Sequence, residues 1–407
     1  MKEGKIINDP VYGFIRIARG LPELLIAHPL MQRLRRIRQL GMASAVYPSA
    51  MHSRFLHSIG AYHLMTEAVN TLKAKGVDIS DSEAEAVASA ILMHDIGHGP
   101  FSHVLENVLI GGACHEDISL LMMERINRET AGALELTLRI FRNDYPKRFL
   151  HQLISSQLDM DRLDYLRRDS FFTGVKEGNI GSERIIKMLD VADGELVVNV
   201  KGLYSIENYL MARRSMYWQV YLHKTVVAAE KMLVNTLLRA RRLMREGHDV
   251  YASPALRHFL YDDIDAARLA ADDRSLYMYG MLDDSDICMA LKMWATCDDR
   301  VLSMLAAGLT GRRLFKVEVS GEPTDAARVA AVTGRLAATF GIGEDDARWL
   351  MSVGTMRKDM YDISDEHISI LMKDGTVRDL AETSELFDNS VLSTKLCKYY
   401  LCYQRFQ

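Results

Sequence analysis

The stretch His94–His103 reads HDIGHGPFSH, and it ends the best-defined helix that the sequence predicts. That helix covers residues 80–94, because Ser80 and Glu83 form a capping box at its start and glycines follow its end. One face of the helix carries Val87, Ala90, Ile91 and His94. The spacing i, i+3, i+4, i+7 places the histidine on the buried face, directly before Asp95.

Histidines gather around this stretch. The chain has 13 histidines, whereas an even spread predicts about two between residues 52 and 115. That window holds His52, His57, His63, His94, His98, His103 and His115. Such an excess indicates metal ligation or acid/base chemistry rather than a purely structural protein.

Composition narrows the class of protein. The 407 residues are 48% hydrophobic and 26% charged, which is typical of a globular protein of two or three structural units. No apolar run reaches the roughly 20 residues of a membrane helix, and the N-terminus lacks an apolar signal region. The five cysteines are scattered without a CxxC pair, so we expect a cytoplasmic protein. A net charge of −4 makes nucleic-acid binding a poor expectation.

The pattern along the chain predicts a mainly α fold, since only eight prolines interrupt long Ala/Leu/Met/Glu/Arg-rich stretches. Besides 80–94, helices are expected at 29–40, 149–168 and 205–245. A turn at Asn8-Asp9-Pro10 precedes a short strand at 14–17, and Asp193-Gly194 predicts a small β hairpin within 187–202. Strands are also expected at 312–320 and at 367–378, the latter turning at Asp374-Gly375. The acid-rich segment 261–286 is interpreted as a solvated surface.

These elements predict two regions. Residues 1–245 form a helical core that includes the N-terminal segment, and residues 246–407 form a mixed α/β C-terminal region. No Gly/Ser-rich or Pro-rich linker separates them, so we expect the second region to pack on the core.

One set of residues has the chemistry of a metal site. His57, the pair His94-Asp95 and Asp161 supply two imidazoles and two carboxylates, a mixed set that suits Mn, Fe, Co, Ni, Zn or Mg. The alternative is that these are core histidines whose hydrogen bonds neighbouring carboxylates satisfy. That alternative is favoured for any single histidine, whereas the set together favours a divalent metal ion.

The pattern H…HD…D resembles the HD-domain metal-dependent phosphohydrolases. Six blocks occur in the order seen in the deoxynucleoside triphosphate (dNTP) triphosphohydrolase branch, typified by the sterile-alpha-motif-linked enzymes. They are NDPVYG (8–13), QRLRRIRQLG (32–41), YPSAMHSRFLHSIG (47–60), LMHDIGHGPFSH (92–103), DMDRLDYLRRDS (159–170) and ARRSMYWQVYLHK (212–224). The resemblance spans roughly residues 5–245, continues more weakly beyond them, and implies an HD-domain helical core.

The resemblance also assigns roles to residues. The metal ligands it implies are His57, His94, Asp95 and Asp161. The triphosphate would lie among Arg54, His98, His103, Arg162, Tyr165 and Arg213, with Arg162 standing where the family usually has Lys. The acid/base set would be His98, Glu106 and His115. Gln39, Leu40, Asp169 and Tyr221 would surround the sugar. Asp169 would accept a hydrogen bond from the 3′-hydroxyl, and Tyr221 would exclude a 2′-hydroxyl.

Some positions depart from the pattern of the family. Tyr217, which is also predicted to bind the substrate, stands where His is usual, Leu222 where Gln is usual, and Arg36 where an aromatic residue is usual. His52 and His63 receive no role, and we interpret both as scaffold.

The implied reaction converts a dNTP to deoxynucleoside and tripolyphosphate. Two alternatives stay open at this point: a phosphohydrolase acting on another nucleotide or phosphodiester, and a nucleotide-sensing or nucleic-acid-binding regulator with weak turnover. The family also binds an activating guanine nucleotide between subunits, which implies a homo-dimer or homo-tetramer. Lys5, Asn8, Gln32 and Arg35 match that effector site. Ala27 replaces the expected acidic residue, so we predict no GTP-specific activation.

Overall fold

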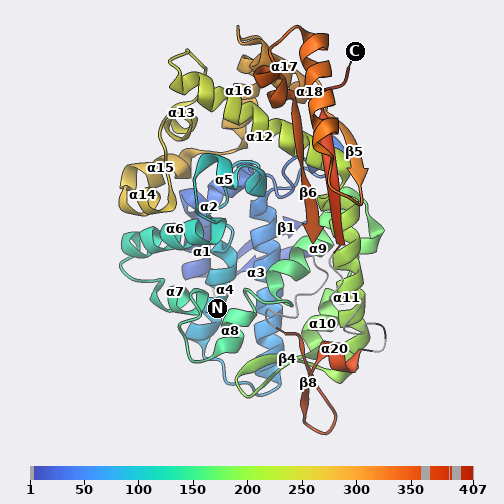
Figure 1. The fold of residues 1–407 in the computed structure, drawn as a ribbon. Coiled ribbons are helices and arrows are strands. Elements are labelled where there is room, and N and C mark those ends of the chain that lie inside the picture. Colours follow the sequence, from blue (N-terminus) through green and yellow to red (C-terminus); the bar gives the residue numbers. More distant parts are fainter. Residues whose placement is uncertain (1–3, 359–366, 385, 387–395, 407) are drawn as a thin grey trace.

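A computed structural model describes residues 4–358, 367–384, 386 and 396–406. Helices dominate these residues, which also form three small sheets (Figure 1). The mainly α fold class predicted from the sequence is confirmed. No helix among the described residues is both long enough and apolar enough to cross a membrane.

The N-terminal segment forms a hairpin and two short helices. Strands β1 (Lys5–Asp9) and β2 (Gly13–Ile17) pair antiparallel around the predicted turn, and α1 (Leu21–Ala27) and α2 (Pro29–Arg33) follow. The helix predicted at 29–40 is wrong in its second half. The chain passes through one 3₁₀ turn, η1 (Leu34–Arg36), and is extended at Ile37, where it pairs with the residues that precede α3.

Three helices form the centre of the core. Helix α3 (Arg54–Ala74) packs on both α4 (Asp81–Met93) and α9 (Met160–Thr173). The predicted capping box of α4 is present, since Ser80 and Glu83 exchange hydrogen bonds. The single helix predicted at 149–168 is wrong. It is broken between α8 (Arg148–Gln152) and α9, because the Asp159 side chain caps a new helix start.

The long helix predicted at 205–245 is also interrupted. Helix α11 (Leu203–Met216) ends in a π-helical turn, η6 (Tyr217–Tyr221), and α12 (Lys224–Arg245) starts after His223 caps its first turn. A π turn is wider than an α turn and is common at functional sites. Here the π turn itself carries two predicted substrate residues, Tyr217 and Tyr221.

The predicted hairpin and both predicted C-terminal strand regions are present. Strands β3 (Leu189–Ala192) and β4 (Glu195–Asn199) pair antiparallel, and β4 then pairs in parallel with β7 (Ser369–Leu371). Strand β8 (Val377–Asp379) completes that sheet after the predicted turn. Strands β5 (Lys316–Ser320), β9 (Leu396–Tyr403) and β6 (Met351–Lys358) form a second, antiparallel sheet in that order.

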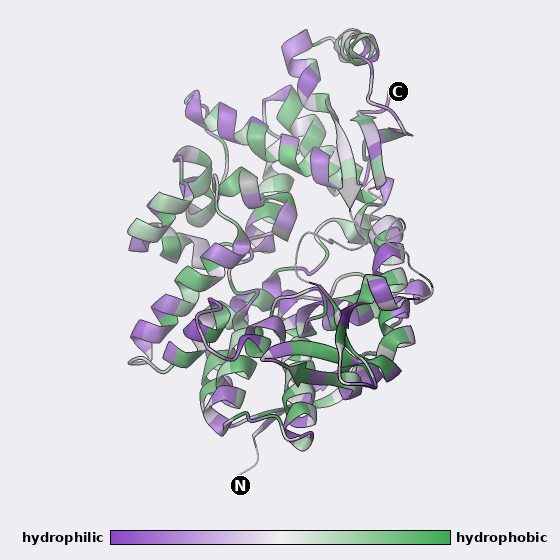
Figure 2. Cartoon of the chain, turned by 60° about the horizontal axis from the view of Figure 1, so that its bottom comes forward, coloured by the Kyte–Doolittle hydropathy of each residue, from purple (hydrophilic) through white to green (hydrophobic). Residues whose placement is uncertain are grey.

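The remaining helices complete both regions. They are α5 (Glu106–Leu109), α6 (His115–Glu129), α7 (Glu135–Phe141), α10 (Ser182–Met188), α13 (Pro254–Tyr261), α14 (Ala266–Ala271), α15 (Asp273–Met281), α16 (Asp284–Trp294), α17 (Arg300–Thr310), α18 (Ala326–Phe340), α19 (Glu344–Ala347) and α20 (Leu380–Thr383). Most of the larger helices show both hydrophobic and hydrophilic residues in Figure 2, as amphipathic helices do. One continuous core runs from Ile15 of β2 to Tyr403 of β9.

Two residues correct the interpretation of 261–286 as a solvated surface. Asp283 and Asp284 are each 5% exposed. Asp283 pairs with Arg36 at 2.5 Å, and Asp284 accepts hydrogen bonds from the backbone N–H groups of Arg38 and Phe101. These carboxylates therefore fasten the C-terminal region to the segments that flank α3 and α4.

The capping box of α4 gives a first prediction about stability. Glu83 accepts hydrogen bonds from the backbone of Ser80, from Tyr145 and from Lys147, and these outweigh burial and lower its pKa to about 2. Glu83→Gln is expected to destabilise the protein by about 1 kcal/mol at pH 7. The loss should be complete above the unfolded-state pKa of about 4.3 and should fade as the pH falls towards 2. Urea unfolding at several pH values measures it, and a pH-independent difference would contradict the assignment.

Candidate active site

Three predicted metal ligands meet at one point. His57 lies on α3, His94 follows the last turn of α4, and Asp161 lies in the first turn of α9. His57 Nε2 is 3.3 Å from His94 Nε2 and 3.0 Å from Asp161 Oδ1, while His94 Nε2 is 3.4 Å from the same carboxylate oxygen. One ion fits between these three atoms, since each supplies a lone pair towards the shared centre.

Asp95, the fourth predicted ligand, lies beside this group. Its Oδ1 is 3.3 Å from His94 Nε2, and its Oδ2 is 3.7 Å from His57 Nε2 and 2.5 Å from Arg54 Nη1. Burial alone would raise the pKa of Asp95, but Arg54 and the neighbouring histidines lower it well below its usual range. The carboxylate is therefore ionised and shared between the histidine centre and an arginine.

A buried charge network holds His57 in place from behind. His57 Nδ1 is 2.7 Å from Asp164 Oδ2, and Arg168 makes two hydrogen bonds to the same carboxylate at 2.9 and 3.0 Å. Arg168 also donates to Asp9 of β1 at 2.8 Å. Gly60 makes room for this network, because a Cβ there would lie 2.0 Å from Asp164 Oδ1. An imidazole whose second nitrogen is bound by a carboxylate is the usual arrangement behind a metal-ligating histidine.

The charges around the histidines fit a cation. Burial alone would lower the pKa of His57, but hydrogen bonds to Asp161 and Asp164 and the nearby carboxylate charges raise it to about 10. His94 Nδ1 lies 2.6 Å from the carbonyl oxygen of Ile91, which leaves its Nε2 for the shared centre. Two imidazoles surrounded by carboxylates favour a positive charge at that centre, and HD domains bind divalent metal ions.

A second cluster contains the remaining predicted catalytic residues. The rings of His98 and His115 stack at 3.9 Å between centroids, and His103 packs edge-on against both. Glu106 Oε1 is 2.9 Å from His115 Nδ1, and its Oε2 is 3.4 Å from His103 Nδ1. These hydrogen bonds outweigh burial and lower the pKa of Glu106. The carboxylate thus holds His115, as expected of a histidine–carboxylate pair.

His98 differs from the other two imidazoles. Burial and the charge of Arg54 lower its pKa well below the usual value, although Asp95 opposes this from 3.3 Å. A neutral imidazole is therefore placed between the arginine, the Asp95 carboxylate and the stacked ring of His115. Such a group is suited to accept a proton or a hydrogen bond at neutral pH.

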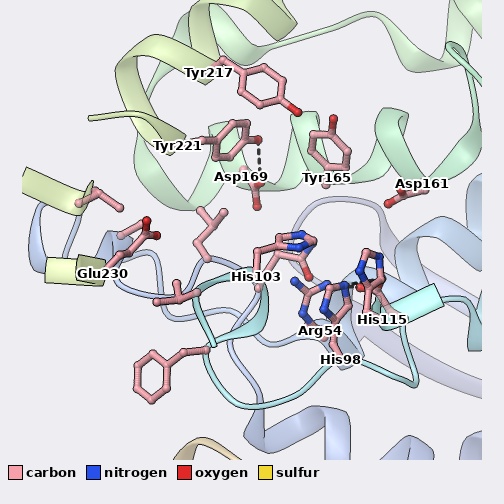
Figure 3. A pocket seen from close by; sticks show the side chains of 18 residues that line it. Arg54, His98, His103, His115, Asp161, Tyr165, Asp169, Tyr217, Tyr221 and Glu230 are labelled. Carbon is pink, nitrogen blue, oxygen red and sulfur yellow. Dashed lines mark hydrogen bonds and ion pairs between the residues drawn. The ribbon is translucent and has the colours of Figure 1, made fainter. Parts of the chain in front are cut away.

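Both clusters open into one cavity of about 330 Å³, shown in Figure 3. The predicted residues that line it are Gln39, Leu40, Arg54, Asp95, His98, His103, His115, Asp161, Tyr165, Asp169, Tyr217 and Tyr221. Two predicted triphosphate residues do not line it. Arg162 pairs with Asp159 at 3.0 Å, and Arg213 donates to Gln157 at 2.9 Å. Both arginines interact electrostatically with Tyr165, which does line the cavity.

The predicted sugar site contains a residue that the sequence interpretation left as scaffold. Tyr221 donates a hydrogen bond to Asp169 Oδ2 at 2.8 Å, and His52 Nε2 lies 2.7 Å from Asp169 Oδ1. His52 is 3% exposed and stacks on Phe172 at 4.4 Å. It therefore fixes the orientation of Asp169. No local pattern links His52 to Asp169, which lies 117 residues further along the chain.

The predicted effector residues lie on the N-terminal segment. Lys5 and Asn8 are on β1, and Arg35 donates to Gln32 at 2.8 Å while its guanidinium stacks on Phe55. Ala27 is the last residue of α1. An effector site here stays a prediction.

Comparisons with known proteins identify the family. A model of the HD domain matches residues 54–190, and a model of the HD associated region matches residues 180–277. The matched ranges contain the whole histidine centre and the two helices that follow the hairpin. This chain belongs to the HD-domain phosphohydrolases.

Individual relatives cover different shares of the chain. A crystal structure of a phosphohydrolase from Bacteroides thetaiotaomicron is 56% identical and covers 99% of this chain and all of that one, with a TM-score of 0.96. The uncharacterized protein YwfO of Bacillus subtilis is 32% identical over 96% of this chain and 90% of its own length. Human deoxynucleoside triphosphate triphosphohydrolase SAMHD1 is 30% identical over 58% of this chain. That match covers 44% of SAMHD1, so it spans less than half of the human protein.

Proposed function

We propose that this phosphohydrolase converts dNTPs to deoxynucleoside and tripolyphosphate in the cavity described above. One observation carries the proposal: Arg54 and two of the predicted metal ligands, Asp95 and Asp161, line the same cavity as the hydrogen-bonded pair Asp169–Tyr221. A phosphate-binding end and a sugar-binding end therefore share one cavity. The matches to the SAMHD1 proteins of human and of Dictyostelium discoideum support the same substrate class.

The phosphate end carries the reaction. Arg54 presents a guanidinium and His103 an exposed imidazole to a triphosphate, which bears about four negative charges. The neutral His98 accepts a hydrogen bond from the attacking water and directs it to the α-phosphorus. His115, whose Nδ1 faces Glu106, keeps Nε2 for the 5′-oxygen, which leaves as a hydroxyl after protonation. A divalent ion bound by His57, His94, Asp95 and Asp161 supplies electrostatic stabilisation of the phosphate charge.

The sugar end selects the nucleotide. Asp169 is held from one side by His52 and from the other by Tyr221, so its lone pairs point in fixed directions. A 3′-hydroxyl satisfies the remaining acceptor capacity of this carboxylate. Tyr221 fills the space beside it, and a 2′-hydroxyl would meet the aromatic ring instead of a polar partner. A site built this way discriminates strongly between substrates that differ by one hydroxyl.

The decisive experiment is a substrate panel. The purified protein is incubated with Mn²⁺ or Mg²⁺ and each of the four dNTPs and four NTPs, and the products are separated chromatographically. We expect deoxynucleoside and tripolyphosphate in equal amounts from dNTPs, and much slower turnover of NTPs. Release of pyrophosphate or single phosphates, or no product from any dNTP, would contradict the proposed function.

The effector segment gives a second prediction. Because Ala27 offers no carboxylate to the N1–H and N2–H₂ groups of guanine, GTP is expected to change the rate of dATP hydrolysis by less than about twofold. Rates measured with dATP alone and with dATP plus GTP provide the test. A tenfold activation by GTP would show that another residue recognises the guanine.

The remaining proposals concern the state of the protein in the cell. We propose a homo-dimer or homo-tetramer, which light scattering of the purified protein tests directly.

We also propose a cytoplasmic location. All five cysteines are free in the structure, and this supports a reducing compartment.

A further inference from the structure

Glu230 is a cavity residue that neither the sequence patterns nor the proposed reaction uses. It lies on α12, one helical turn after Val226, and both residues line the cavity. Figure 3 shows Glu230 at one end of the cavity, with Asp161 and His115 at the other end and Tyr221 and Asp169 between them. The carboxylate thus lies beyond the sugar site, on the side away from the phosphate site.

The surroundings of Glu230 leave its carboxylate without a protein partner. Within the described part of the chain, no hydrogen bond or ion pair of this carboxylate is found, and the side chain is half-buried in the lining of the cavity. Its Oε1 lies 3.8 Å from where a Cβ on Gly41 would be, and the cavity lining on this side includes Leu40 and Ala43. Burial raises the pKa of Glu230 to about 7, and Lys231 opposes this.

The carboxylate of Glu230 has lost part of its hydration without gaining a hydrogen-bond donor from the protein. Partial removal from water disfavours the charged form of a carboxylate, which is why the pKa of Glu230 is raised. Here the free face of the carboxylate points into a cavity whose other end fits a triphosphate and whose middle fits a sugar. Donors on a bound molecule would restore the missing hydrogen bonds.

We infer that Glu230 contacts the base of the bound nucleotide and selects bases that present N–H donors to it, with guanine preferred. This inference rests on the proposed function and adds the base to its substrate. A specificity-determining role is distinct from the chemistry at the phosphate end, because Glu230 lies at the opposite end of the cavity.

The preference for guanine follows from the hydrogen-bonding edges of the bases. Guanine presents N1–H and N2–H₂ side by side, and two parallel N–H donors match the two oxygens of one carboxylate. Adenine and cytosine present one amino group next to a ring nitrogen that is itself an acceptor. Thymine presents N3–H between two carbonyl oxygens, which repel a carboxylate. We therefore expect the order dGTP, then dATP and dCTP, then dTTP.

The test compares kcat/KM for dGTP and dTTP at pH 8, where Glu230 is mostly ionised. The variants are Glu230→Gln, which removes the charge but keeps the shape, and Glu135→Gln, a control at an exposed glutamate on α7. The dGTP-to-dTTP ratio is expected to fall at least about tenfold in Glu230→Gln, because each hydrogen bond to a charged group contributes strongly to discrimination. The ratio in the Glu135→Gln control is expected to equal that of the unmodified protein.

The ratio separates the possible outcomes. Partial misfolding lowers both rates in one preparation and leaves the ratio intact, and Glu230→Ala provides a second variant that must shift the ratio the same way. An enzyme that hydrolyses dNTPs but keeps its ratio within twofold in both Glu230 variants would overturn the inference alone. If the unmodified protein hydrolyses no dNTP, the proposed function fails and the inference fails with it.

Discussion

Asp161→Ala is expected to lose bound metal and to lose activity by about three orders of magnitude or more. Among the described residues, Asp161 contributes the only carboxylate oxygen that lies within about 3.4 Å of both Nε2 atoms of the histidine centre. The fold is expected to persist, because its side chain is 31% exposed whereas that of His57 is fully buried. Elemental analysis of the purified variant and hydrolysis of dNTPs measure the two effects.

A matched control accompanies this variant. Asp144 is an exposed aspartate between α7 and α8, and Asp144→Ala is expected to keep both metal and activity. If Asp161→Ala retained stoichiometric metal, the assignment of the centre would be wrong. If metal were lost while the rate stayed unchanged, the metal would have no part in the reaction.

Asp164→Ala is expected to damage stability and the metal centre together. Removing this carboxylate leaves Arg168 buried with only Asp9 as a partner, and breaking a buried ion pair costs about 3–5 kcal/mol. The same change frees Nδ1 of His57, and loss of such a supporting carboxylate lowers metal affinity by about 10–100-fold. Thermal unfolding of the metal-free protein and metal titration separate the two effects.

The isosteric variant Asp164→Asn sharpens this prediction. An amide keeps one oxygen acceptor for Arg168 or His57 but loses the charge, so its destabilisation should be smaller than that of alanine. Metal affinity is still expected to fall, because the amide no longer increases the basicity of the imidazole. An alanine variant that unfolds at the same temperature as the unmodified protein would contradict the buried network.

The features that were predicted correctly from the residues alone depend on contacts that are local in the chain. The Ser80–Glu83 capping box and the apolar face of 80–94 are readable because each depends on residues within one or two helical turns. The hairpin at Asp193-Gly194 is readable for the same reason. His57, His94 and Asp161 come from different helices, and their meeting was predicted from the type of residue and from family resemblance.

The features that the sequence did not predict depend on tertiary contacts. The break at Asp159 and the extended backbone at Ile37 arise where a side-chain cap or a neighbouring strand competes with helix formation. His52 and Asp169 are hydrogen-bonded although they lie far apart in the sequence, and no periodic pattern of residues relates their two segments. Arg162 and Arg213 were assigned to the phosphate from family position alone; in the described structure they pair with Asp159 and Gln157, and their contact with phosphate stays a prediction.

The orientation of Tyr221, and with it the choice of substrate, depends on the number of residues in the π-helical turn Tyr217–Tyr221. Successive residues of an α-helix are turned by about 100°, and a π turn holds one residue more than an α turn. Deleting a single residue there would let α11 run on in regular α-helical register and would swing Tyr221 away from Asp169. None of His57, His94, Asp95 and Asp161 lies on this segment. Insertions and deletions of one residue thus offer evolution a way to change which nucleotide is accepted while the hydrolytic chemistry stays untouched.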